Sequence, residues 1–166
     1  MKKILVALDG STRDADVLDA SIRMAVPLGA SLVLLRVVGM KVDFPLDLVR
    51  VTPEEFEHLM EEKARDALVQ CAKAIPAEVR WEPLVVTGVP WKEIGEVAKS
   101  EDVDLVVIGA HGYGGLDRLL GTTAARIVNH ADRSVLVVRA EARLIPDADE
   151  RRPVHQSDSP ERGHFD

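Results

Sequence analysis

Cysteine and aromatic residues are scarce in this chain. Cys71 is the single cysteine, so no disulfide can form within the chain, and no cysteine and histidine cluster has zinc-site spacing. This cysteine content fits a reducing compartment, and we predict a cytoplasmic protein. Aromatic residues make up 4% of the sequence and hydrophobic residues 46%, mostly Val, Leu, Ile and Ala, as is typical of buried parallel strands alternating with helices.

Long hydrophobic runs are also lacking. The start imitates a signal peptide, but the apolar run from Ile4 to Leu8 ends at Asp9 and is shorter than the roughly 7–15 residues of an h-region. No segment approaches the ~20 apolar residues that cross a bilayer. We therefore expect a soluble protein without a membrane partner, whose first apolar run is a strand.

The charge balance is acidic. A net charge of −7 and a pI near 5.3 repel a polyanion, so we expect no nucleic-acid partner. A small anionic ligand stays compatible with this charge, because backbone amides and a helix N-terminus bind phosphate locally.

A chain of 166 residues is long enough for one domain. Apolar runs of strand length alternate with helical patterns, which predicts an α/β fold: a doubly wound, Rossmann-like, five-stranded parallel sheet with helices on both faces. The predicted strands are 3–8, 31–38, 79–86, 105–108 and 134–138. Residues 39–51 are expected to be irregular, and the polar segment 141–166 is expected to be a disordered tail after a domain of residues 1–140.

The predicted helices have recognisable ends. Ser11 and Asp14 have capping-box spacing before the first helix, and Gly29 suits a left-handed residue after it. The second helix opens with Thr52 as N-cap and Pro53 at the first position, and runs to about residue 74. Pro90 opens the third helix. The expected buried faces are Ala15, Leu18, Ile22, Ala25 and Val26 in the first helix, Ile94, Val97 and Ala98 in the third, and Ala124, Ile127 and Val128 in the fourth.

Ligands of such sheets bind at the carboxyl ends of the strands, near the point where the strand order reverses. The turn at Asp9 and Gly10 and the loop 109–121 are the candidates there. Five glycines fall within the thirteen residues of that loop. Glycine lets backbone amides approach phosphate oxygens, and the following helix offers free N–H groups. A tight connection with Thr122 capping the helix explains the loop equally well.

Common nucleotide fingerprints are absent. The sequence contains no Gly-x-x-x-x-Gly-Lys-Ser/Thr, and the first strand is not followed by Gly-x-Gly-x-x-Gly. P-loop hydrolysis and ordinary NAD chemistry therefore lose support. No nucleophile, base and orienting group are brought together by the sequence, so we do not expect an enzyme.

The sequence resembles the universal stress protein family. The matching segments are KILVALDGS at 3–11, Gly88-Val89-Pro90, DLVVIGAHG at 104–112 and GTTAARIVNHADRSVLVVR at 121–139. The ATP-binding branch of the family has Gly-x-x-Gly, a spacer and then Gly-Ser/Thr, which Gly109, Gly112, Gly121 and Thr122 match. The spacer 113–120 has eight residues, one fewer than in the family pattern.

The resemblance implies a binding site for ATP, or for AMP or ADP, with Mg²⁺ accompanying the nucleotide. It implies that Asp9 contacts ribose and that Ala7, Leu8 and Val37 surround the adenine. It implies that the phosphates are held by Gly109, Gly112, Gly121, Thr122 and Thr123. From the residues alone, Asp9 is equally a turn residue that bonds its own backbone, and the three apolar residues are ordinary strand packing.

Three functional hypotheses follow. The first is a nucleotide-binding, dimeric stress-response regulator. The second is a nucleotide-independent scaffold of the same family, in which the shorter spacer marks a lost phosphate site. The third, an adenylyl-transferring enzyme, is disfavoured because the first strand is followed by Asp9-Gly10-Ser11-Thr12 and not by a Ser-Gly-Gly-x-Asp-Ser loop.

The resemblance also implies a homodimer through the last strand, Ser134 to Val138. His111 and Arg118 are expected to be solvated loop residues, and Cys71 to be packed. His58, Glu61 and Glu62 could be imagined as a metal site, but on so charged a helix they are expected to form its solvent face.

Overall fold

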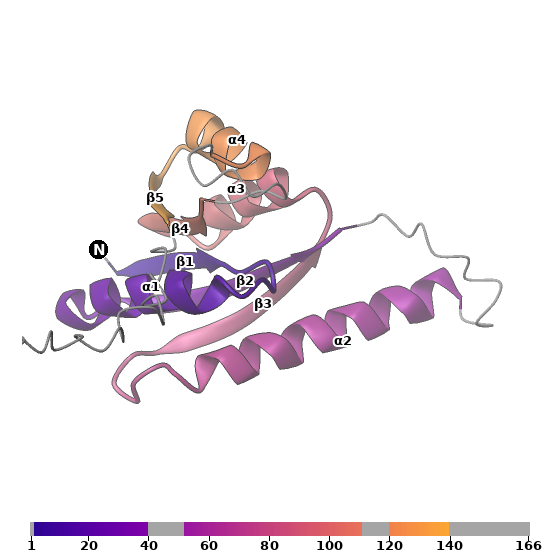
Figure 1. The fold of residues 1–166 in the computed structure, drawn as a ribbon, viewed down its shortest axis with the longest axis horizontal. Coiled ribbons are helices and arrows are strands. Elements are labelled where there is room, and N and C mark those ends of the chain that lie inside the picture. The colour runs from indigo at the N-terminus through magenta and orange to yellow at the C-terminus, as the bar shows by residue number, and fades with distance from the viewer. Residues whose placement is uncertain (1, 40–51, 111–119, 140–166) are drawn as a thin grey trace, which may run out of the picture.

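The fold is a parallel sheet between two pairs of helices (Figure 1). A computed structural model describes residues 2–39, 52–110 and 120–139. The strands are β1 Lys3–Ala7, β2 Ser31–Val38, β3 Trp81–Thr87, β4 Leu105–Gly109 and β5 Ser134–Val138. The helices are α1 Asp14–Leu28, α2 Pro53–Ala72, α3 Pro90–Ser100 and α4 Thr122–His130. The predicted doubly wound α/β architecture is confirmed.

The strand order is β3-β2-β1-β4-β5, and all neighbouring strands are parallel. β1 is central, with Ile4 opposite Leu32 of β2 and Leu105 of β4. The order reverses at β1, because the chain adds β2 on one side and returns to add β4 on the other. The loops that follow β1 and β4 therefore leave the sheet side by side.

Two hydrophobic clusters cover the two faces of the sheet. On one face, α1 and α2 pack with the side chains of Ile4, Val6 and Leu34. On the other face, α3 and α4 pack with Leu5, Val33 and other alternate residues. The central strands are buried on both faces, which explains why their sequences are continuous apolar runs without polar alternation.

The start of α1 differs from the prediction. The N-cap is Arg13, without a side-chain capping bond, so the predicted capping box of Ser11 and Asp14 is wrong. The Asp14 carboxylate turns back instead and accepts hydrogen bonds from the amides of Asp9 and Gly10. The end of α1 is as expected, with Gly29 in the left-handed region at φ 59°.

The start of α2 follows the prediction. Thr52 accepts a hydrogen bond from the amide of Glu55, whose side chain accepts one from the amide of Thr52, and Pro53 occupies the first helical position. This capping box satisfies two N–H groups that the helix itself leaves unpaired. The helix ends at Ala72, two residues before the predicted end.

Some predicted boundaries and buried positions are wrong. β3 begins at Trp81, because Val79 belongs to the preceding turn, where its amide bonds to the carbonyl of Pro76. Ala15, Val26 and Val128 are exposed, since α1 buries Val17, Leu18, Ser21 and Ala25, and α4 buries Ala124 and Ile127. Helical spacing identified the helices but did not fix how each is rotated on the sheet.

Residues 40–51 and 141–166, for which an irregular segment and a disordered tail were predicted, lie outside the described residues. Among the helices that are described, none has both the length and the hydropathy needed to cross a bilayer.

Candidate functional site

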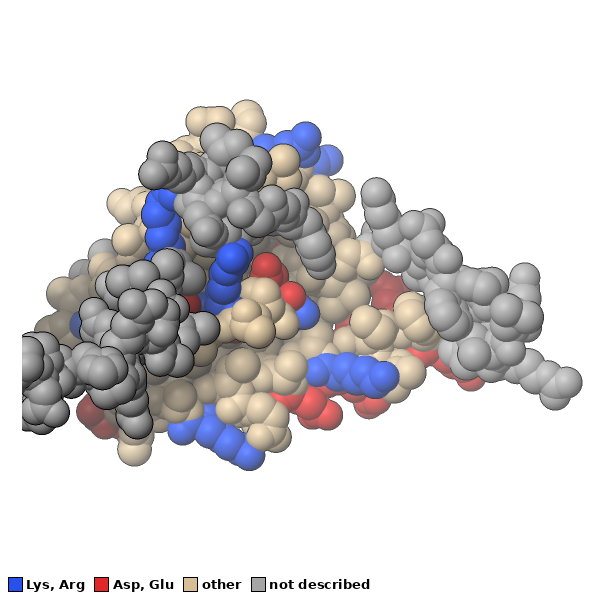
Figure 2. Space-filling view, viewed as in Figure 1, with Lys and Arg blue, Asp and Glu red and all other residues tan. Residues whose placement is uncertain are grey.

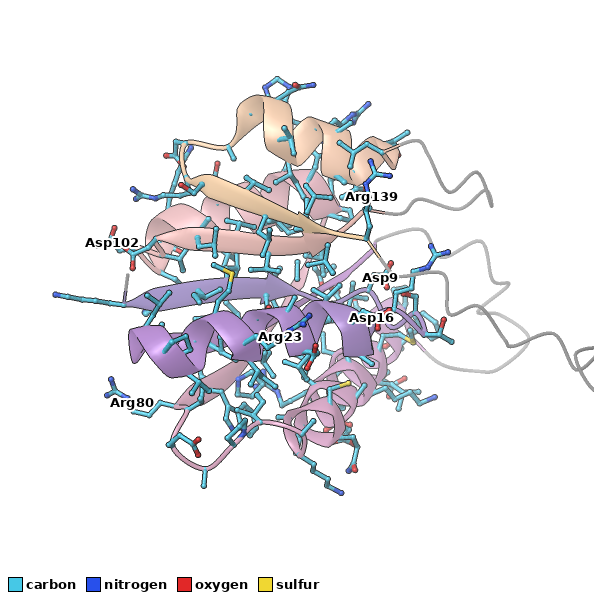
Figure 3. All side chains as sticks on the ribbon, turned by 60° about the vertical axis from the view of Figure 1, so that its left-hand side comes forward. Asp9, Asp16, Arg23, Arg80, Asp102 and Arg139 are labelled. Atoms are coloured by element: carbon cyan, nitrogen blue, oxygen red, sulfur yellow. The ribbon has the colours of Figure 1, made fainter. Side chains whose placement is uncertain are left out.

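The candidate site lies at the carboxyl edge of the sheet. Figure 3 shows Asp9, after β1, and Arg139, after β5, at this edge, and Arg80 and Asp102 at the opposite edge. Because β1 and β4 are parallel neighbours, the turn after β1 and the loop after β4 start from adjacent strand ends. These are the two loops that the sequence pattern selected.

The base of the loop after β4 is closed by the backbone. The amide of Gly121 donates a hydrogen bond of 2.9 Å to the carbonyl of Ala110. The amide of Ala110 in turn donates one of 2.8 Å to the carbonyl of Val138, at the end of β5. The two ends of the glycine-rich loop are thus fixed to the sheet edge. Its residues 111–119, which include the predicted ligand Gly112 as well as His111 and Arg118, lie outside the described residues.

The first turn of α4 lies at this edge, and the backbone N–H groups of Thr122 and Thr123 have no hydrogen-bond partner among the described residues. Gly121 is the N-cap and makes no side-chain capping bond, so Thr122 is not the cap that the alternative interpretation required. Thr122 and Thr123 are exposed at the first two helical positions. The first N–H groups of a helix have no partner within it and carry the positive end of its dipole. This turn is therefore suited to an anion.

At the end of β4, packing against the described residues does not require Gly109 to be a glycine. A Cβ built there would lie 3.5 Å from Cγ2 of Val17, an ordinary contact.

The turn after β1 is held by its own side chains. Asp9 Oδ1 accepts a hydrogen bond of 2.9 Å from the amide of Ser11, which is the self-bonded turn named as the alternative for Asp9. Partial burial works to raise the pKa of Asp9, but hydrogen bonds from Ser11 and Asp14, together with the charge of Arg36, outweigh it and keep the pKa below its ordinary value. Asp9 is ionised at neutral pH and can accept further hydrogen bonds.

Asp14 and Arg36 complete this turn. Asp14 Oδ1 and Oδ2 accept hydrogen bonds of 3.0 and 2.8 Å from the amides of Asp9 and Gly10. Nη1 of Arg36 donates one of 3.3 Å to the carbonyl of Leu8 and lies 3.9 Å from Asp14 Oδ2. Burial raises the pKa of Asp14 to about 6, and the Asp9 carboxylate adds to this, although the amide of Asp9 and Arg36 favour the charged form.

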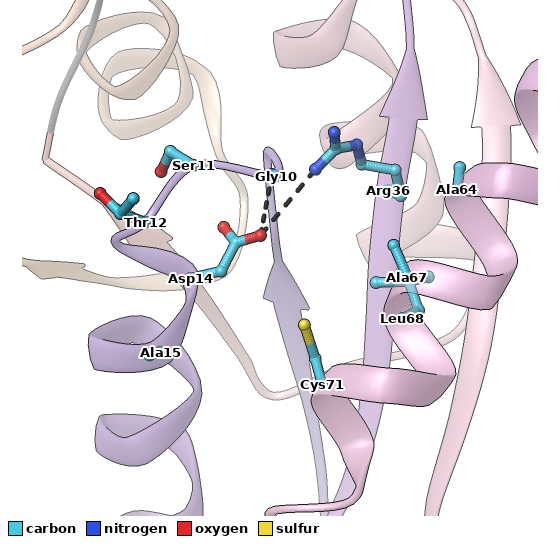
Figure 4. A pocket seen from close by; sticks show the side chains of 10 residues that line it. All are labelled: Gly10, Ser11, Thr12, Asp14, Ala15, Arg36, Ala64, Ala67, Leu68 and Cys71. Carbon is cyan, nitrogen blue, oxygen red and sulfur yellow. Dashed lines mark hydrogen bonds and ion pairs between the residues drawn. The ribbon is translucent and has the colours of Figure 1, made fainter.

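A cavity of about 290 Å³ adjoins these groups, between α1 and α2 (Figure 4). Asp14 and Arg36 form its charged end, while Ala64, Leu68 and Cys71 of α2 form an apolar wall. Burial raises the pKa of the Cys71 thiol, and the charge of Asp14 raises it further, while Arg36 opposes the shift. Cys71 is half-buried, in agreement with the prediction of a packed cysteine.

The three residues implied to surround adenine do not share one face. Ala7 and Val37 are half-buried and pack on the side of α3 and α4. The Leu8 side chain is 3% exposed in the cluster under α1 and α2, so only its backbone could meet a ligand beside Ala7 and Val37. Ordinary packing accounts for the Leu8 side chain.

The sequence analysis did not predict that Asp14 accepts hydrogen bonds from the turn after β1, and it did not consider Arg36. Asp14 was assigned to a helix cap because its spacing from Ser11 fits one. Arg36 could have been identified from the sequence, since it is the single charged residue in the apolar run Ser31–Val38. A charge inside a buried strand needs a partner, and here it has the Leu8 carbonyl and Asp14.

The charged face of α2 carries no described metal site. His58 forms an exposed ion pair with Glu62 at 3.3 Å, and Glu61 accepts a hydrogen bond from Thr87. No group of three metal-binding side chains occurs among the described residues. Acidic and basic side chains are interspersed along the lower edge of Figure 2, where α2 lies.

Comparison with known proteins supports the resemblance. The sequence model of the Universal stress protein family matches residues 1–139. The chain belongs to this family. Universal stress protein A homolog 1 of Coxiella burnetii is 31% identical over 146 residues, which cover 82% of this chain and 95% of that protein. Universal stress protein YxiE of Bacillus subtilis is 33% identical over 145 residues, covering 82% and 98%.

Solved structures of the family share the Rossmann-like fold. UspA from Lactobacillus plantarum superposes with a TM-score of 0.68 at 28% identity, over 83% of this chain and 97% of that one. A universal stress protein in complex with cAMP has a TM-score of 0.58 at 24% identity, over 83% and 96%. The Archaeoglobus fulgidus protein in complex with dAMP has a TM-score of 0.54 at 18% identity, over 82% and 97%. The last two identities are low enough that they show the fold alone.

Proposed function

We propose that this universal stress protein binds an adenine nucleotide at the carboxyl edge of β1 and β4 and acts as a dimeric, ligand-responsive regulator in the cytoplasm. The proposal rests on two groups that follow neighbouring strands. An ionised acceptor, Asp9, follows β1, and an uncapped helix N-terminus with Thr122 and Thr123 follows the neighbouring β4. Family members in complex with cAMP and dAMP support a nucleotide as the ligand class.

Each part of the proposed site suits one part of a nucleotide. A carboxylate accepts hydrogen bonds from the vicinal hydroxyls of ribose, which is the role of Asp9. The amides and hydroxyls of the first turn of α4 receive phosphate oxygens, as helix N-termini commonly do. Ala7 and Val37 offer half-buried apolar surface on the side of α3 and α4 for the base. ATP, ADP and AMP all satisfy this arrangement.

Mg²⁺ would accompany ATP through the phosphates. Because no described cluster of carboxylates, cysteines or histidines is suited to a metal, the ion would be held mainly by phosphate oxygens and water. In this proposal the protein contributes the phosphate-binding amides and no dedicated metal ligands.

The second candidate function is a nucleotide-independent scaffold of the same family. The observation in its favour is the spacer 113–120, which is one residue shorter than in the ATP-binding pattern. An enzymatic role has less support, since the described site contains no activated nucleophile beside a base.

Calorimetric titration of ATP with magnesium into nucleotide-stripped protein tests the proposal. Gly121→Val is the blocking variant, because φ −59° and ψ 155° at Gly121 also suit valine and the substitution adds a branched side chain directly before the first turn of α4, where the phosphates are proposed to bind. Gly95→Ala, in α3, is the control, since nothing lies within 4 Å of its new methyl group. Binding to wild type and Gly95→Ala but not to folded Gly121→Val is expected. No binding to wild type would favour the scaffold.

The regulatory part of the proposal needs its own measurement. In the proposal, the nucleotide contacts the loop after β4 and so alters the surface that a partner or second subunit senses. We expect hydrogen exchange in residues 111–119 to slow when ATP saturates the protein. Unchanged exchange in a protein that demonstrably binds ATP would oppose a regulatory role for this loop.

A further inference from the structure

We infer that Asp14 and Arg36 are positioning residues for this site: they hold the turn after β1 in the shape that presents Asp9 to ribose, and Asp14 does so fully only while ionised. The inference rests on the proposed function and adds a proton-linked control of ribose recognition. Neither residue belongs to the set implied by the family pattern.

Asp14 fixes two consecutive peptide units. Its two carboxylate oxygens each accept a hydrogen bond, from the amide of Asp9 at 3.0 Å and from the amide of Gly10 at 2.8 Å. An ionised carboxylate accepts at both oxygens, whereas a protonated carboxyl group turns one of them into a donor. The full pair of contacts therefore belongs to the charged form of Asp14.

Arg36, on β2, holds the first of these two peptide units from its carbonyl side. Its Nη1 donates to the carbonyl of Leu8, and its guanidinium lies against Gly10 (Figure 4). Its charge also lies near that of Asp14, with 3.9 Å between Nη1 and Oδ2. Two successive peptide units, Leu8–Asp9 and Asp9–Gly10, are thus held by one carboxylate and one guanidinium.

The positioning contacts and the proposed ligand lie on different faces of the sheet. Arg36 and Asp14 line the cavity between α1 and α2. The half-buried surface of Ala7 and Val37 lies on the side of α3 and α4. Asp14 and Arg36 can therefore support Asp9 from behind without occupying the space proposed for the nucleotide.

The surroundings of Asp14 explain its proton affinity. Asp9 faces it from the turn, Arg36 from β2 and the Cys71 thiol from α2. Burial raises the pKa of Asp14 to about 6, with a further contribution from the Asp9 carboxylate. Protonation turns one acceptor oxygen of Asp14 into a donor, so the amides of Asp9 and Gly10 no longer both have their partner. The turn then holds Asp9 less firmly, so ribose recognition should weaken as the pH falls through about 6.

Comparison of ATP with 2′,3′-dideoxy-ATP isolates this effect. The two ligands share base and phosphates, so the ratio of their dissociation constants reports the ribose hydroxyls alone. For wild type we expect a ratio of about ten at pH ~7.5, as for a charged hydrogen bond, falling to a few-fold at pH ~5. Asp14→Asn, which resembles the protonated side chain, should keep the low ratio at every pH. Arg36→Met should lower the ratio throughout.

Asp16→Asn is the matched control. Asp16 lies in the same first turn of α1 and the substitution changes the charge equally, but its carboxylate makes no hydrogen bond to the described residues. This variant should retain the wild-type profile. A wild-type ratio that is constant with pH, or an Asp14→Asn profile identical to that of wild type, would overturn the inference.

The free protein separates this inference from the proposed function. If wild type binds no ATP at any pH, the proposed function fails, and the turn is tested by NMR without a ligand. The amide resonances of Asp9 and Gly10 should titrate with a midpoint near 6 in wild type and stay constant in Asp14→Asn. Resonances that do not titrate in wild type would overturn the positioning role independently of nucleotide binding.

Discussion

The guanidinium of Arg36 lies against Gly10 on the side where any other residue would carry its Cβ. A Cβ built on Gly10 would overlap Cζ and both terminal nitrogens of Arg36. Gly10 also has φ 81°, in the left-handed region that favours glycine. The backbone conformation therefore favours glycine at this position of the turn, and any larger residue would also have to displace the Arg36 guanidinium from its contacts with Leu8 and Asp14.

Gly10→Ala should destabilise the protein by about 1–3 kcal/mol, because alanine strains the left-handed backbone and displaces the guanidinium. Urea unfolding measures this change. Gly95→Ala provides the comparison, since it lies inside α3 with nothing within 4 Å, and should stabilise by about 0.5–1 kcal/mol. Equal stability of Gly10→Ala and wild type would mean that the turn does not hold Gly10 in this conformation.

Asp14 should make the stability pH-dependent. Its pKa is raised from 3.8 to about 6 in the folded protein, so between these values the folded state keeps a proton that the unfolded chain releases. The resulting stabilisation is complete below 3.8 and is lost as the pH rises through about 6. The free energy of unfolding of wild type, relative to Asp14→Asn, should fall by roughly 1–3 kcal/mol over this window.

Urea unfolding of wild type and Asp14→Asn at a series of pH values measures the difference between their free energies of unfolding. The contributions of the other titrating groups largely cancel in this difference. Asp16→Asn should follow wild type through the same window, since it leaves the Asp14 contacts in place. A difference between wild type and Asp14→Asn that does not vary with pH would contradict the raised pKa. Stability that is lost as the pH rises through about 6, together with ribose recognition that weakens as the pH falls through the same value, would have one meaning. The charged form of Asp14 would then lower the stability of the fold while improving ribose recognition.

Cys71 should react slowly with alkylating reagents. Burial, with the nearby charge of Asp14, raises the pKa of its thiol, so less thiolate is present at neutral pH. We expect iodoacetamide to modify folded protein more slowly than urea-unfolded protein, and Asp14→Asn to react faster than wild type. Equal rates for the two folded proteins would show that Asp14 does not influence the thiol.

The sequence was most informative where one short segment determines its own structure. Ser31–Val38 was predicted with both boundaries correct, because an apolar run of this length between turn residues, with Arg36 as its single charged residue, is typical of a strand buried on both faces. Thr52 was predicted as the N-cap of the second helix with Pro53 at its first position, and the structure has both.

The errors arise where two distant segments must meet. Asp14 has the spacing of a helix cap, but its carboxylate turns to the amides of Asp9 and Gly10 because the strand end brings them within reach. Arg36 reaches this turn only because β2 pairs with β1, and that pairing is set by the whole sheet. Local spacing selected the two loops of the candidate site, but it could not identify Asp14 and Arg36, which contact the turn after β1.

The last strand offers a test of the proposed dimer. β5 pairs only with β4 within the described chain, and Val135 to Val138 are half-buried. A strand edge of this kind exposes backbone N–H and C=O groups that another chain can pair. We propose that a second copy covers it, which would protect an apolar edge from aggregation.

Val137→Lys should therefore convert the dimer into a monomer. A lysine at Val137 would place a charge in an interface that excludes water, whereas Val26→Lys, at a site on α1 that is 44% exposed, should leave the assembly intact. Light scattering should give a mass near twice 18.2 kDa for wild type and Val26→Lys, and near 18.2 kDa for Val137→Lys. Because Val137 also packs on the side of α3 and α4, circular dichroism must show that the variant is folded. A folded Val137→Lys protein of dimer mass would exclude β5 as the interface.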